Sequence, residues 1–193
     1  MEAARRAEVK PARRIFHACN SVALAFLPPL LGVGRWTVVG VLGVLFAGLL
    51  AFDLTRLRRP DLNETFFRMV PSLASSRERV GIASSTWYTL GALLVYALFP
   101  ERVWIPALLV LGFADPSASV VGRLWGRRRL GQGTVLGTTV FVLVAWAVAA
   151  WAIGPWRGLA AALLVAAGEI LPWPLDDNLT VPVAAAAALT LLG

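Results

Sequence analysis

VWIPALLVLGFADPSASVVGRLWGRRR, residues 103–129, joins an apolar run to a cluster of arginines. Residues 103–122 supply the mainly apolar segment of about 20 residues that a helix needs to cross a bilayer. Lys and Arg are enriched in the cytoplasmic loops of membrane proteins. The stretch therefore predicts a transmembrane helix whose C-terminal end faces the cytoplasm.

Six further apolar stretches occur along the chain, at residues 15–34, 36–54, 84–100, 134–153, 156–173 and 179–192. Hydrophobic residues make up 58% of the 193 residues and charged residues 15%, whereas about a quarter are charged in soluble domains. We therefore predict an all-α, polytopic transmembrane helix bundle with about seven spans, forming one domain over residues 1–193. The last stretch is short, so six spans are the alternative.

The basic residues indicate how the bundle is oriented. With the N-terminus placed in the cytoplasm, 15 of the 18 Lys and Arg fall on the cytoplasmic side, and only Arg35, Arg102 and Arg157 fall outside. We predict a cytoplasmic N-terminus, with a basic segment at 1–14 and an amphipathic cytoplasmic region at 55–83. The positive charge then reflects topology and contact with anionic lipid. No nucleic-acid partner is expected, and the chain fits a bacterial cytoplasmic (inner) membrane.

One ionisable residue, Asp115, lies within the apolar stretch 103–122. A charge there costs several kcal/mol unless it is paired, solvated or bound to a metal. Helical spacing places four residues on one face: Asp115, Ser119, Gly122 and Gly126. Four arginines follow on the cytoplasmic side: Arg123, Arg127, Arg128 and Arg129.

Two interpretations of this face compete. Small residues at four-residue spacing commonly pack helices together, and arginines after a span commonly only set its orientation. Alternatively, bare backbone and arginines suit a metal-bound polyphosphate. The carboxylate of Asp115 favours the second interpretation.

A second acidic segment is AGEILPWPLDDNLTVP, residues 167–182. Glu169 lies in apolar sequence, and Asp176, Asp177 and Asn178 follow it in a loop. Oxygen ligands of this kind suit Mg²⁺. One of the three loop residues is also expected to cap the following helix, which leaves Glu169 unexplained.

Four other polar residues fall toward the cytoplasmic side: His17, Asp53, Arg77 and Glu78. His17 is either a phosphate or proton-relay residue or an interfacial anchor. The stretch 66–94 either lies among lipid headgroups or is a solvated linker. The sequence holds no P-loop, kinase catalytic loop, nucleophile elbow or dinucleotide fingerprint.

Four ordered segments resemble one enzyme family. They are RRIFH (13–17), the pair Arg77–Glu78 with TWYTLGALL (86–94), ADPSASVVGRLWGR (114–127), and Glu169 with PLDDNLTVP (174–182). The sequence resembles the dolichol kinase, phytol kinase and CTP-dependent diacylglycerol kinase family, itself related to phosphatidate cytidylyltransferases. The resemblance implies Mg²⁺-dependent transfer of the γ-phosphoryl group of CTP to an isoprenoid alcohol or diacylglycerol at the cytoplasmic membrane face.

The resemblance also implies roles for individual residues. Asp115, Glu169 and Asp177 would be catalytic, and Asp115, Asp176 and Asp177 would bind the metal. Nucleotide binding would fall to Ser119, Gly122, Arg123, Gly126, Arg127, Arg128, Arg129 and Thr134. The chain departs from the family pattern at Gly133 and Leu136, which stand where Lys and Glu are usual.

Three other functions remain as alternatives. A cytidylyltransferase would release pyrophosphate and form a CDP-lipid. A transporter would hold its charges near the membrane midplane and often show internal repeats, and a scaffold would have no activity. A lipid and a nucleotide are the expected partners, and a homodimer is compatible with the sequence.

Overall fold

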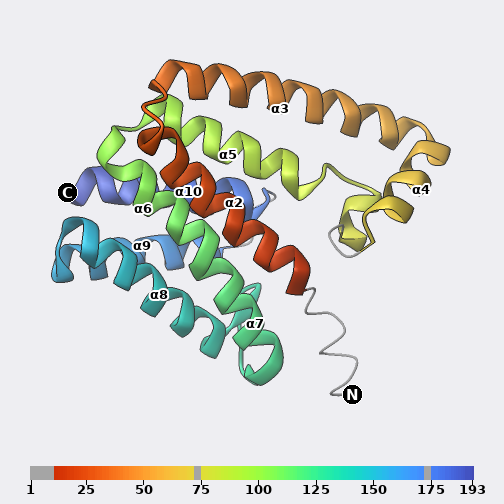
Figure 1. Cartoon of the computed structure of the whole chain (residues 1–193). Helices are drawn as coiled ribbons and strands as arrows, with labels where there is room; N and C mark the ends of the chain where they lie inside the picture. The colour runs from red at the N-terminus through yellow and green to blue at the C-terminus, as the bar shows by residue number, and fades with distance from the viewer. Residues whose placement is uncertain (1–10, 72–74, 172–174) are drawn as a thin grey trace.

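The computed structural model describes residues 11–71, 75–171 and 175–193 (Figure 1). Within these residues the fold is the predicted all-α bundle of a membrane protein. Its main helices are α2 Pro11–Leu30, α3 Arg35–Arg58, α4 Pro60–Met69, α5 Ser84–Leu98, α6 Trp104–Leu109, α7 Asp115–Trp125, α8 Val135–Ile153, α9 Pro155–Ile170 and α10 Asp177–Leu192. Shorter elements are the turns η1 Ser76–Arg79 and η2 Glu101–Val103, the π-helix η3 Val110–Ala114 and the strands β1 Arg129–Leu130 and β2 Gly133–Thr134.

Each of the seven predicted stretches is largely helical. In the described part of the chain, three helical segments are long and apolar enough to cross a membrane: Arg35–Arg58, Glu101–Trp125 and Val135–Ile153. Asp177–Leu192 is a shorter apolar helix. Seven spans and a cytoplasmic N-terminus therefore remain predictions. Most of the predicted basic segment at 1–14 lies outside the described residues.

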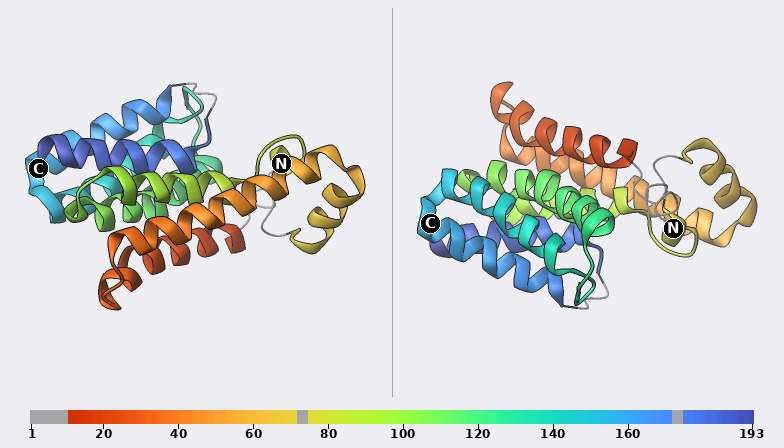
Figure 2. Two further views of the ribbon diagram at one scale, coloured as in Figure 1. Left: turned by 90° about the horizontal axis from the view of Figure 1, so that it is seen from above. Right: turned by 90° about the horizontal axis from the view of Figure 1, so that it is seen from below.

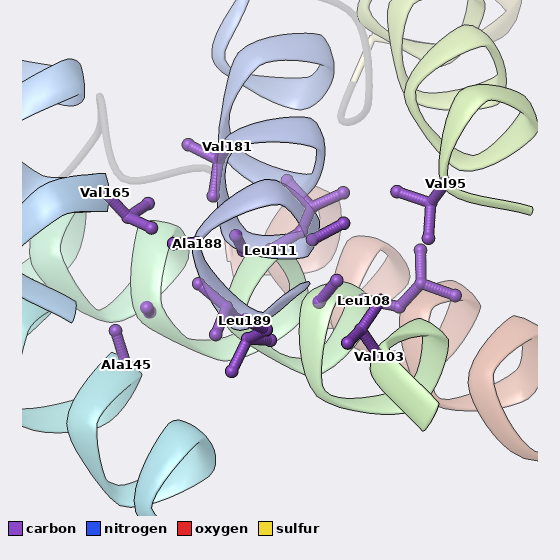
Figure 3. Close-up of a cluster of buried hydrophobic side chains, with 14 of the residues drawn as sticks. Val95, Val103, Leu108, Leu111, Ala145, Val165, Val181, Ala188 and Leu189 are labelled. Atoms are coloured by element: carbon purple, nitrogen blue, oxygen red, sulfur yellow. The ribbon is translucent and has the colours of Figure 1, made fainter. Parts of the chain in front are cut away.

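Small and branched apolar side chains form the core between α5, α6, α8, α9 and α10. Figure 3 shows Val95, Leu108, Ala145, Val165 and Leu189 pointing into this cluster from the five helices. Many of the other core residues are alanines, and small residues allow helices in a membrane to approach closely. The alanine-rich sequences of α9 and α10 therefore account for the tight packing of this half of the bundle.

The helices α2 and α3 lie on one side of this core (Figure 2). α2 packs on α6 and η3, and α3 packs on α5. The Tyr96 hydroxyl donates to the Leu24 carbonyl at 2.6 Å. Cys19, the single cysteine of the sequence, is exposed on α2.

The ends of the helices meet at two opposite ends of the bundle. At one end, Arg35 donates to the Ala97 carbonyl. At the other end, Arg14 of α2 reaches Ser119 of α7, and Gly131 of the hairpin lies against Ile170 of α9. The second end carries the regions that charge counting assigns to the cytoplasm, and it contains the candidate site.

Candidate functional site

A pocket of about 570 Å³ lies at this second end, between α7, the β-hairpin, and the ends of α8, α9 and α10. We call it the polar pocket. Among the predicted site residues, its lining includes Arg77, Asp115, Ser119, Gly122, Arg123, Gly126, Arg127, Arg129, Thr134, Glu169 and Asp177. Carboxylates from three separate chain segments therefore share one cavity with arginines.

A break in the helical hydrogen bonding precedes Asp115. The π-helix η3 ends at Ala114, and Asp115 and Pro116 begin α7. Proline has no amide hydrogen and clashes with the carbonyl four residues earlier, which here belongs to Gly112 within η3. Single-turn π-helical segments within α-helices are frequently found at functional sites. The local sequence thus places Asp115 at a helix start, with Ser119 one turn further along the same pocket.

Arg14 holds this part of α7 against α2. Its guanidinium donates to the Pro116 carbonyl and to Ser119 Oγ, both at 2.9 Å. Sequence reasoning treated Arg14 only as a topology signal. Its position in the RRIFH motif, three residues before the motif's histidine, was the available signal that it does more than orient the helix.

The two glycines of α7, Gly122 and Gly126, allow the helix to pack closely against the side chain of Thr134. A Cβ on Gly122 would lie 2.8 Å from Thr134 Oγ1, and one on Gly126 would clash with the same side chain. Thr134 caps α8, because its hydroxyl accepts from the Gly137 amide at 3.1 Å. The packing interpretation therefore holds for Gly122 and Gly126, although both also line the pocket.

The β-hairpin follows the arginine run, leads into α8 and packs against the end of α9. Arg129 pairs with Thr134, and Gly131 in the turn has φ +54. A Cβ on Gly131 would clash with the Ile170 carbonyl, so only glycine permits this approach. Arg127 and Arg129 line the pocket, whereas Arg128 is not among its lining residues.

Glu169 has an unsatisfied oxygen. Its Oε2 is buried and has no hydrogen-bond partner among the described residues. A buried carboxylate oxygen without a partner is costly, so a cation or a donor from a ligand would stabilise it. The described residues contain no group of three or more His, Cys, Asp or Glu side chains arranged to hold a metal unaided.

Asp176 fulfils the expected role of helix cap. Its Oδ1 accepts from the Asn178 backbone amide at 3.0 Å and from the Asn178 side chain. Its Oδ2 lies 3.5 Å from Ser84 Oγ. Neither Asp176 nor Asn178 is among the residues that line the polar pocket, whereas the neighbouring Asp177 is.

Asp53 belongs to a separate, buried network. It accepts from Arg56 Nε at 2.7 Å, from the Ala83 amide at 2.9 Å and from Thr86 Oγ1 at 2.6 Å. Arg56 itself is 0% exposed. This network joins the end of α3 to the start of α5, and Asp53 lies apart from the polar pocket.

The last two candidates, His17 and Glu78, line a different cavity between α2, α3 and α5. Glu78 forms an ion pair with Arg13 at 3.0 Å and accepts from Ser84 Oγ at 3.0 Å. His17 contacts the Tyr88 ring edge-on, with ring centroids 5.6 Å apart. Ser84 and Arg13 were not identified from the sequence, because their partners lie far away along the chain.

Comparison with curated proteins confirms the family resemblance. CTP-dependent diacylglycerol kinase 1 of Schizosaccharomyces pombe is 25% identical over 176 residues, covering 80% of this chain and 81% of the relative. The Saccharomyces cerevisiae protein of the same name is 27% identical over 141 residues, covering 69% of this chain and 48% of the relative. The chain thus spans about half the length of the Saccharomyces relative.

A third similar protein, CTP-dependent diacylglycerol kinase 1 of Eremothecium gossypii, is 31% identical over 81 residues, covering 42% of this chain and 26% of the relative. No family model matches the chain. No solved structure matches it either.

Proposed function

We propose that this membrane protein is a CTP-dependent lipid-alcohol kinase. The observation that carries the proposal is the polar pocket, in which Asp115, Glu169 and Asp177 meet arginines at one end of an apolar bundle. Phosphoryl transfer needs alignment of the reactants and neutralisation of phosphate charge. The similarity to proteins named as CTP-dependent diacylglycerol kinases supports the choice of CTP as donor and of a lipid alcohol as acceptor.

The arginines of the pocket would bind the triphosphate. Arg123, Arg127 and Arg129 line one region of it, and guanidinium groups bind phosphate through paired hydrogen bonds. Gly133, Thr134 and Gly137 at the N-terminal end of α8 also line the pocket. The N-terminus of a helix attracts anions, so this end adds to the positive potential for the phosphates.

The pocket also fits Mg²⁺. This ion is usually held by one or two carboxylates together with water and substrate phosphates, and the unsatisfied Oε2 of Glu169 is such a ligand. We assign Asp115 and Glu169 to the metal. Asp176 is left out because its oxygens already cap α10 and contact Ser84. When bound, Mg²⁺ would neutralise negative charge on the transferred group.

In the proposed reaction the acceptor hydroxyl oxygen attacks the γ-phosphorus of CTP. A new P–O bond forms, and the bond between the γ-phosphorus and the β–γ bridging oxygen breaks. CDP leaves with that electron pair. Asp177 takes the alcohol proton, because it lines the pocket and follows the cap residue that contacts Ser84. The arginines hold CDP and the transferred group in line throughout.

The experiment compares two labels of CTP. Purified protein in detergent is incubated with Mg²⁺, with CTP labelled at either the γ- or the α-phosphate, and with diacylglycerol, isoprenoid alcohols or a lipid phosphate such as phosphatidate. Transfer of only the γ-label to lipid supports the kinase. Transfer of the α-label instead would establish a cytidylyltransferase, and no labelled lipid with any acceptor would contradict the proposal.

Matched variants test the pocket itself. Asp115→Asn should abolish most of the transfer, because it removes a carboxylate from the metal site. Asp61→Asn serves as the control, since Asp61 lies exposed on α4, away from the pocket. Equal activity of the two variants would contradict the role assigned to Asp115.

A further inference from the structure

A second cavity, of about 590 Å³, lies between α2, α3 and α5. We call it the apolar groove. Most of its wall is hydrocarbon, including Leu24 and Leu27 of α2 and Leu42, Leu45 and Leu49 of α3. Its residues run along α2 from Arg13 to Pro28, a distance of about 22 Å at the helical rise per residue. The groove is therefore long, narrow and apolar.

The groove is open on the side that faces lipid. Leu27 and Leu45 are each 48% exposed although they line it. α2 and α3 lie on the outer side of the bundle (Figure 2), and α3 is one of the helices apolar enough to span a membrane. In such surroundings the molecules that can enter an apolar opening are lipids.

One end of the groove is polar. Arg13 donates to Ser84 Oγ at 2.6 Å and pairs with Glu78 at 3.0 Å, and Ser84 donates to Glu78 at 3.0 Å. His17 lines the same end. A molecule that fits the whole groove thus has a long hydrocarbon part and a small polar group at one end.

This polar end adjoins the polar pocket. Arg77 lines the polar pocket, and the next residue, Glu78, lines the groove. In the same way Asp177 lines the pocket, whereas Asp176 lies 3.5 Å from Ser84 of the groove. Two pairs of consecutive residues therefore form a wall with one member toward each cavity.

We propose that the apolar groove binds the hydrocarbon chain of a lipid alcohol, with its hydroxyl at the Arg13–Glu78–Ser84 end. This inference rests on the proposed kinase function, for which it supplies the acceptor site. It explains why the groove is mostly apolar and why its charged residues, Arg13 and Glu78, lie beside the wall that it shares with the polar pocket. It also assigns Ser84 and Glu78 as positioning residues for the acceptor hydroxyl.

The test uses a diacylglycerol that carries a diazirine in one acyl chain. After irradiation in detergent, mass spectrometry locates the labelled residues in the wild-type protein and in Asp115→Asn, so the readout does not require catalysis. We expect labelling of α2 and α3 residues of the groove in both proteins. Labelling confined to other helices would overturn the inference.

A pair of variants at neighbouring positions gives a second readout. Leu45→Trp fills the groove, whereas Val44→Trp places the same large side chain at a position that is 77% exposed and not among the groove residues. We expect Leu45→Trp to lower photolabelling and to raise the KM for the lipid about tenfold, equivalent to about 1.4 kcal/mol of lost binding, without changing the KM for CTP. Equal effects of both variants would overturn the inference.

The outcomes separate the two proposals. If lipid is phosphorylated but the groove is not labelled, the acceptor site is wrong and the kinase function stands. If the groove is labelled but no lipid is phosphorylated, the lipid site stands and the kinase function is wrong.

Discussion

The buried pair formed by Asp53 and Arg56 offers the sharpest test of the structure. Their exposed fractions are 1% and 0%. Arg56 donates to Asp53, to Asn63 Oδ1 at 2.8 Å, and to the carbonyls of Glu78 and Gly81 at 2.8 and 2.9 Å. The pair thus fixes the segment that carries Arg77 and Glu78 to the end of α3.

Asp53→Asn keeps the shape of the side chain but removes its charge. The two carboxylate oxygens of Asp53 face three donors, from Arg56, Ala83 and Thr86, so an amide in either orientation points its NH₂ group at a donor. Removing one partner of a buried pair costs about 3–5 kcal/mol. We expect the free energy of unfolding to fall by about that amount, which is a large share of the roughly 5–15 kcal/mol of a typical protein.

Two measurements check this expectation. Unfolding in mixed micelles is followed by the fluorescence of the eight tryptophans, and trypsin cleavage after the exposed Arg77 and Arg79 reports local loosening. Glu64→Gln is the control, because the pair of Glu64 with Arg68 is 3.6 Å long and both side chains are largely exposed. Such pairs contribute about 0–1 kcal/mol.

A double variant separates charge from packing. Asp53→Asn combined with Arg56→Met removes the uncompensated cation, so its loss of stability should be smaller than the sum of the two single losses. If Asp53→Asn is no less stable than Glu64→Gln and trypsin cleaves it at the wild-type rate, Asp53 and Arg56 do not form the buried pair described above.

Three further outcomes are expected. Gly122→Ala should lower thermal stability by about 1–3 kcal/mol, because its methyl group would lie 2.8 Å from Thr134 Oγ1; an unchanged melting temperature would contradict this packing. Chelation with EDTA should abolish transfer to lipid, and added Mg²⁺ but not Na⁺ should restore it; activity that survives EDTA would contradict the metal site. Gly133→Lys should lower the KM for CTP several-fold, since Gly133 lines the polar pocket and has open space around it, whereas Leu136→Glu, outside the pocket lining, should leave that KM unchanged; equal effects would count against the nucleotide site.

The parts of the fold that depend on composition were predictable from the sequence. Apolar runs of about 20 residues predicted the helices, because a helix satisfies all of its backbone hydrogen bonds within one segment, as lipid requires. Carboxylates in apolar sequence are costly and therefore rare. This is why Asp115 and Glu169 stood out, and the structure does bring both to one pocket with Asp177.

Contacts between distant segments could not be predicted in the same way. Arg13 and Ser84 are 71 residues apart, and Arg14 and Ser119 are 105 residues apart. Arg56 was counted as a cytoplasmic charge, but the structure buries it completely. A positive-inside count uses only position along the chain, so it does not distinguish an arginine that faces lipid headgroups from one that holds two helices together.

The two cavities explain how one small bundle would handle two reactants with opposite solvent preferences. A nucleoside triphosphate cannot enter the apolar groove, because each of its phosphate charges would cost several kcal/mol in hydrocarbon. A lipid chain gains nothing in the polar pocket, which is lined by arginines and carboxylates. Among the described residues, the wall formed by Arg77–Glu78 and Asp176–Asp177 borders both cavities. Under the two proposals the acceptor oxygen and the γ-phosphorus therefore meet at this wall, and positioning there contributes to the rate as it does in other phosphoryl transfers.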